Sequence, residues 1–191
     1  MEKDYIDFNS PFAISKFSNS LLKYLVHSIF DYDEIVILCI GTDRSTGDAL
    51  GPLVGYKLMP HMFKYDKVHL MGTLDEPVHA KNLDEYIDVI KTSHANAFVL
   101  AIDASLGHNS CIGQIIIKEG PLKPGLGVNK KLPSIGNLSI TGVVNVGGLM
   151  EYMVLQNTRL SLVMNMADVI AKGIDLTLFK VYGNILDKKI K

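Results

Sequence analysis

The chain has 191 residues, of which 48% are hydrophobic and 20% charged, and its formal net charge is -1. This length supports one domain over residues 1–191 with a core that needs no disulfide or metal, and the composition excludes a disordered chain. The near-neutral charge argues against nucleic acid or an anionic membrane as the main partner. Because no apolar run approaches the length of a membrane span and residues 1–5 are too polar for a signal peptide, we expect a soluble, cytoplasmic protein.

The first half of the chain alternates between helical and strand patterns. Ser10 and Pro11 form a helix-start signal, and the apolar stripe that follows predicts a helix over residues 11–30. An unbroken apolar run at 35–40 predicts a strand that is covered on both faces. Helical spacing predicts further helices over 48–59 and 83–92. Between them we expect a strand over 67–72 and a loop over 72–79.

The second half continues this alternation. Strand patterns cover residues 97–102, 111–118 and 138–144, and helical patterns cover 146–156 and 160–172. A long loop rich in proline and glycine is predicted over 119–136. Four methionines are expected in the core or between packed helices: Met150, Met153, Met164 and Met166. Strands separated by helices favour parallel βαβ units, so we predict a three-layer α/β/α sandwich with a mostly parallel sheet.

The turn at residues 41–52 is the first candidate for a functional segment. It is rich in glycine and leads from a buried strand into a helix, which places it at the sheet edge where open α/β proteins bind ligands. Asp48 lies at the start of that helix. Its carboxylate could serve only as a helix cap, and the turn by itself does not exclude this structural role.

Asp48 and Asp103 each follow one of the two most strand-like segments, so parallel strands would bring both to one edge of the sheet. Two carboxylates that lie close together share one proton, which makes an acid and a base available at once. That combination can activate water and protonate an amide leaving group. The same pair could instead hold a divalent cation, and the sequence leaves both alternatives open.

Six further residues are predicted to contact a substrate near the aspartates. They come from the turn, from the loop over 72–79 and from the last strand: Thr42, Asp43, Arg44, Glu76, His79 and Thr141. His79 is the preferred histidine for the site, and His108 is the second choice. For a histidine in a loop, a surface or structural role is the alternative.

Three segments resemble a known family. Residues 47–52 (Gly-Asp-Ala-Leu-Gly-Pro), 74–80 (Leu-Asp-Glu-Pro-Val-His-Ala) and 101–104 (Ala-Ile-Asp-Ala) are similar to the sporulation protein family called YyaC, over nearly the whole chain. That family resembles the germination protease of spore-forming bacteria and, more widely, the hydrogenase maturation peptidases. The resemblance implies the maturation-peptidase fold and a catalytic role for Asp48 and Asp103.

The function implied by this resemblance is a sporulation-associated aspartic peptidase inside the developing or germinating spore. Its expected partner is a protein or peptide substrate, such as the small acid-soluble spore proteins. No cofactor and no metal is expected, since the region around Thr141 and Gly142 has no histidine to complete a nickel site like that of the maturation peptidases. A non-catalytic peptide-binding relative and a metal-dependent hydrolase are the alternatives. Exposed apolar surface on the terminal helices would indicate self-association.

Overall fold

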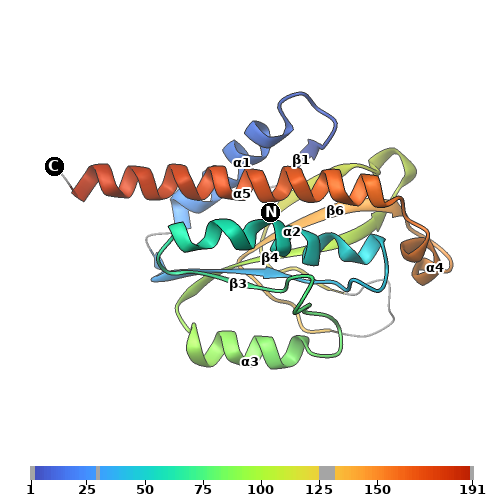
Figure 1. Ribbon diagram of the computed structural model, residues 1–191, viewed down its shortest axis with the longest axis horizontal. Coiled ribbons are helices and arrows are strands. Elements are labelled where there is room, and N and C mark those ends of the chain that lie inside the picture. Colours follow the sequence, from blue (N-terminus) through green and yellow to red (C-terminus); the bar gives the residue numbers. More distant parts are fainter. Residues whose placement is uncertain (1–2, 29–30, 125–131, 190–191) are drawn as a thin grey trace.

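The structure is a computed structural model that describes residues 3–28, 31–124 and 132–189. Its centre is a six-stranded sheet with helices on both faces (Figure 1), in the order β1-β5-β6-β4-β2-β3. The strands are β1 (Lys3–Asp7), β2 (Glu34–Cys39), β3 (Val68–Met71), β4 (Ala97–Gly107), β5 (Gln114–Glu119) and β6 (Leu138–Val146). Strands β3, β2, β4 and β6 run parallel to one another, whereas β5 is antiparallel to both of its neighbours. The predicted α/β fold with a mostly parallel sheet is confirmed.

The helices divide between the two faces of the sheet. They are α1 (Ala13–Ser28), α2 (Leu50–Leu58), α3 (Leu83–Ser93), α4 (Glu151–Gln156) and α5 (Leu160–Lys189), with the short 3-10 helices η2 (Gly47–Ala49), η3 (Met59–Lys64) and η4 (Asn109–Cys111). Helices α1, α2 and α5 cover one face, and α3 covers the other (Figure 1). Helix α4 lies at one end of the molecule. Among the helices of the described ranges, none combines the length and the apolar character needed to cross a membrane.

Alternating side chains of the buried strands supply two separate apolar cores. In β2, Ile35, Ile37 and Cys39 pack with the cluster beneath α1, α2 and α5. Val36 and Leu38 point to the opposite face and pack with α3. An unbroken apolar run is what a strand needs when both of its faces are covered, which explains why β2 and β4 were recognisable.

Several element boundaries differ from the prediction. Strand β1 was missed because a short edge strand with alternating charges has almost no apolar signal. Helix α5 continues far beyond residue 172, since Ile174, Leu178 and Val181 extend its buried stripe. Helix α1 begins at Ala13, and the predicted end of that helix at 29–30 lies outside the described residues. Residues 125–131 of the predicted loop over 119–136 lie outside them as well.

The prediction for the methionines is wrong for two of the four. Met166 is fully buried, and Met164 packs partly buried against the core. Met150 and Met153 are 67% and 49% exposed. Helix α4 has only six residues, and it does not pack Met150 and Met153 against the core. Helical spacing in this segment therefore did not imply burial.

Candidate active site

The turn after β2 folds back so that Asp48 lies above the end of that strand. The Thr42 N–H donates to the carbonyl oxygen of Asp48 at 3.1 Å. Gly41 has φ +145°, and a Cβ at Gly41 would lie 2.0 Å from that same carbonyl oxygen. Only glycine therefore permits this close return of the chain. Asp48 is the N-cap of neither η2 nor α2, so helix capping does not account for its position.

Helix α2 is packed directly onto backbone, which fixes the start of the helix relative to the sheet. A Cβ at Gly51 would lie 2.0 Å from the carbonyl oxygen of Ile40, and a Cβ at Gly55 would lie 1.9 Å from that of Gly72. These two glycines are one helical turn apart and face the strand ends. The backbone that carries Asp48 thus has little freedom to move away from the sheet.

Asp103 lies inside β4, not in a loop after it, because the strand continues to Gly107. Its side chain is only 7% exposed. One carboxylate oxygen, Oδ1, accepts a hydrogen bond of 2.8 Å from the Ala104 N–H. In the neighbouring parallel strand β6, Thr141 is the register partner of Asp103 and is half-buried. Asp103 and Thr141 therefore face the same side of the sheet.

The two aspartates interact electrostatically, and this interaction separates their protonation behaviour. Burial raises the pKa of Asp103 well above its ordinary value, and the neighbouring charge of Asp48 raises it further, while the Ala104 N–H acts in the opposite direction. Burial also raises the pKa of Asp48, but the Thr42 N–H and the charge of His79 oppose that shift. Asp103 is consequently the carboxyl that holds a proton, and Asp48 is the carboxyl that ionises first.

His79 reaches the site because its loop runs beside the end of β2. Val78 forms a parallel bridge with Ile40, and the Gly41 N–H donates to the Val78 carbonyl oxygen at 2.8 Å. The His79 Nδ1 accepts a hydrogen bond of 3.3 Å from the Lys81 N–H, so a neutral ring carries its proton on Nε2. The metal-ligating atoms of His79, Asp48 and Asp103, all of them described residues, do not lie within 4.8 Å of one another.

The other residues predicted to contact a substrate differ in how far their side chains are exposed. Thr42 is half-buried beside Asp48, and its Oγ1 accepts a hydrogen bond of 3.3 Å from the Arg44 N–H. Asp43, Arg44 and Glu76 have exposed side chains. The Glu76 N–H donates to Thr73 Oγ1 within its own turn. His108, the second choice for a histidine, is exposed and hydrogen-bonds Ser110 Oγ at 2.9 Å.

Two features of this region were not predicted from the sequence. Ser45 is 7% exposed within the turn, and its hydroxyl has no hydrogen-bond partner among the described residues. An open hollow of about 390 Å³ lies beside α4, lined by Asn145, Val146, Leu149, Met150, Met153, Val154 and Asn157. A Cβ at Gly47 would lie 2.8 Å from the Leu155 side chain, so η2 packs against α4. Helix α4 therefore borders the hollow and also contacts the element that carries Asp48.

Comparison with protein families gives a match over most of the chain. Residues 5–173 match the family described as "Protein of unknown function (DUF1256)". The chain belongs to this family. It is also 57% identical over 143 residues to "Uncharacterized protein YyaC" of Bacillus subtilis (strain 168), an alignment that covers 75% of this chain and 69% of the relative. The expected relationship to YyaC is thereby confirmed.

A solved structure shares the fold of this DUF1256 chain. The crystal structure of a NiFe hydrogenase maturation protease, HycI from Thermococcus kodakarensis KOD1, aligns with a TM-score of 0.53 and 21% sequence identity. The alignment covers 81% of this chain and 98% of HycI. At this identity the similarity concerns the fold. The predicted maturation-peptidase fold is confirmed.

Proposed function

We propose that this DUF1256 protein is a peptidase that uses Asp48 and Asp103 to hydrolyse a peptide bond with water. The observation that carries the proposal is the interaction of two carboxyl groups at the carboxyl edge of a parallel sheet. Burial and the charge of Asp48 raise the pKa of the buried Asp103 more strongly than burial raises that of Asp48. Separating the pKa values of two carboxyl groups is how an acid and a base are maintained together at one pH. The fold shared with a protease supports the same class of reaction.

The proposed reaction assigns one proton transfer to each aspartate. The Asp48 carboxylate accepts a proton from water as the water oxygen attacks the peptide carbonyl carbon, while the Asp103 carboxyl donates its proton to the carbonyl oxygen. In the second step the tetrahedral intermediate collapses. Its C–N bond breaks, the proton on Asp48 passes to the leaving nitrogen, and Asp103 recovers a proton from a hydroxyl of the intermediate. The sum is one water added across one peptide bond.

The hollow beside α4 supports a protein or peptide as the substrate. Leu149, Met150 and Met153 expose apolar side chains there, 92%, 67% and 49% respectively. Exposed apolar surface beside a helix that packs on η2, the element carrying Asp48, suits the binding of an apolar segment of an extended chain. Methionine side chains adapt to differently shaped partners, which favours a surface with broad tolerance for its ligand.

We further propose that this activity belongs to sporulation or germination, a proposal supported by the similarity to YyaC and by the resemblance to the germination protease. The substrate would be a protein of the spore interior, with small acid-soluble spore proteins as the first to test. A non-catalytic peptide-binding role is the second candidate, because the exposed apolar hollow would serve binding without cleavage.

The test is cleavage of purified small acid-soluble spore proteins by the wild type and by Asp48→Asn and Asp103→Asn, each with and without chelator. We expect cleavage by the wild type, unaffected by chelator, and a loss of at least about 100-fold in either variant. Asp88→Asn is the matched control, since it removes an exposed carboxylate from α3, which covers the other face of the sheet. Full activity of Asp103→Asn would refute the acid–base assignment. Binding of the substrate by the wild type without cleavage would favour the second candidate.

A further inference from the structure

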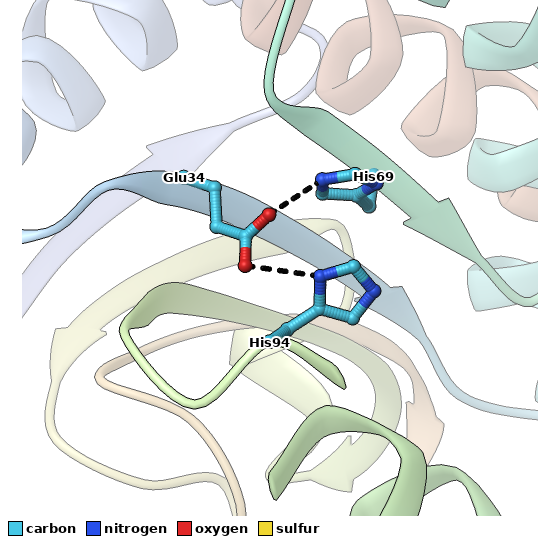
Figure 2. Close-up of side chains that lie close together, drawn as sticks. All are labelled: Glu34, His69 and His94. Atoms are coloured by element: carbon cyan, nitrogen blue, oxygen red, sulfur yellow. Dashed lines mark hydrogen bonds and ion pairs between the residues drawn. The ribbon is translucent and has the colours of Figure 1, made fainter. Parts of the chain in front are cut away.

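A second cluster of chemically reactive side chains lies at the opposite edge of the sheet. It contains Glu34, the first residue of β2, His69 in β3, and His94 at the C-terminus of α3 (Figure 2). The Glu34 carboxylate lies between the two rings. Its Oε2 is 2.7 Å from His69 Nε2, and its Oε1 is 3.1 Å from His94 Nδ1.

This cluster is separate from the proposed active site. Glu34 pairs with Ala97 at the start of β4, whereas Asp103 lies six residues further along that strand. Six residues of strand span about 20 Å. An activity of the aspartate pair and any role of the cluster can therefore be measured independently.

Backbone hydrogen bonds hold the segments that carry the three side chains in place. His69 is the register partner of Val36 in the β2–β3 ladder. The His94 N–H donates to Ile90 at the end of α3, and the His94 carbonyl oxygen accepts from the Ala97 N–H, both at 3.0 Å. Because regular hydrogen bonding anchors each ligand-bearing segment, little conformational entropy would be lost if the side chains converged on an ion.

We propose that Glu34, His69 and His94 bind a Zn²⁺ ion that ties β2, β3 and the α3–β4 connection together. One ligand atom from each residue lies within 4.8 Å of those of the other two, which distinguishes this group among the described residues. Two imidazole nitrogens and one carboxylate oxygen form a ligand set typical of zinc, whereas Mg²⁺ and Ca²⁺ favour oxygen ligands. Water would occupy the fourth position, which three protein ligands leave open.

The geometry requires only a small adjustment to accept the ion. Ligand atoms about 2.0–2.1 Å from a tetrahedral zinc are about 3.3 Å from each other, so the contact of 2.7 Å between Glu34 and His69 must widen slightly. The side chains of His69, Glu34 and His94 are 39%, 21% and 15% exposed, so an ion can enter from solvent and still be partly shielded. The single carboxylate supplies the negative charge for the cation.

The alternative is a metal-free cluster in which the carboxylate simply joins two imidazoles. The rings are also in contact, with centroids 4.2 Å apart and an interplanar angle of 43°. Burial raises the pKa of Glu34, but the hydrogen bonds from His94 and His69, together with the charges of these rings, outweigh this and hold it below its ordinary value. Both arrangements are compatible with these contacts, so direct measurement of metal binding distinguishes them.

The first experiment titrates the chelator-treated, dialysed protein with Zn²⁺ by isothermal calorimetry at neutral pH. We expect one ion per chain with a Kd of about 1 µM or tighter. His69→Gln and His94→Gln should each weaken binding by about 100-fold or more, since loss of a ligand exceeds the loss seen for groups that only support one. His108→Gln is the matched control, because the exposed imidazole of His108 hydrogen-bonds only Ser110 among the described residues. This variant should bind zinc like the wild type.

Two measurements on the wild type keep the test decisive if a variant fails to fold. At a free Zn²⁺ concentration of 100 times the Kd, the melting temperature should rise by about 5 to 10 °C and return on addition of chelator. In NMR spectra of the imidazoles, the signals of two of the six histidines should move on zinc addition. No saturable binding below about 100 µM, or equal binding by the wild type and both ligand variants, would overturn the proposal.

Discussion

The backbone N–H of Gly41 donates a hydrogen bond of 2.8 Å to the carbonyl oxygen of Val78, which aligns the loop carrying His79 with the end of β2. The charge of His79 lowers the pKa of Asp48. We therefore expect His79→Gln to raise that pKa and move the acidic limb of the pH–rate profile to higher pH. The profile of cleavage against pH, measured for both proteins, checks this. An unchanged acidic limb would contradict a coupling between His79 and Asp48, and His108→Gln should leave the limb in place.

The pH–rate profile of cleavage by the wild type should also reflect the raised pKa values of both aspartates. Activity requires an ionised Asp48 and a protonated Asp103, and burial raises the pKa of both groups, that of Asp103 more strongly. Both limbs of a bell-shaped profile should therefore lie at higher pH than for two carboxyl groups in water. Measurement of kcat/KM between pH 3 and 9 provides the test. A profile that is flat throughout this range would argue against catalysis by the pair.

Asp103 should reduce the stability of the folded protein at neutral pH. Its pKa in the folded state lies above the ordinary value of 3.8, so the folded protein binds more protons than the unfolded chain between those two values. Stability must then fall as pH rises through this interval, by about 1.4 kcal/mol for each pKa unit of the shift.

Asp103→Asn removes this ionisation and keeps an oxygen that can accept from the Ala104 N–H. We expect the variant to be more stable than the wild type at pH 7, and the difference to disappear below pH 3.8. Urea denaturation across this pH range measures both curves. Parallel curves would show that Asp103 titrates similarly in the folded and unfolded states.

The close packing of α2 on β2 predicts that two Gly→Ala substitutions in helices will have very different effects on the free energy of unfolding. Gly51→Ala would place a Cβ 2.0 Å from the Ile40 carbonyl oxygen, and we expect a loss of about 3 kcal/mol in the free energy of unfolding. Gly183→Ala in α5 is the control, because apart from the nearby backbone of the helix itself no atom of the described residues lies within 4 Å of the added Cβ. It should stabilise the helix by up to about 1 kcal/mol. Equal stabilities of the two variants would contradict the described packing.

The hollow beside α4 should affect substrate binding more than the chemical step. Leu149→Ser and Met153→Ser each remove exposed apolar surface, and we expect each to raise KM about tenfold with little change in kcat. Phe63→Ser is the control, since Phe63 is 84% exposed on η3, outside the residues that line the hollow. A fall in kcat at constant KM would indicate that the segment acts on the geometry of the aspartates instead.

The sequence alone predicted five of the six strands, most of the flanking helices and the positions of Asp48 and Asp103 after the apolar runs of β2 and β4. An apolar pattern is a local signal, and the buried strands β2 and β4 each contain an unbroken apolar run. Strand β1 and the second half of α5 lacked it, because β1 is a short charged edge strand and α5 passes through Gly173 and Asp175 at the point where its pattern weakens.

Only the tertiary structure decided which distant side chains meet. Glu34, His69 and His94 are separated by 35 and 25 positions along the chain, and their convergence depends on strand order and register, which no short pattern encodes. The same is true of Thr141 opposite Asp103. The raised pKa of Asp103 likewise arises from burial by elements far apart in sequence. Local chemistry determined which residues could react, whereas packing determined their neighbours and their protonation.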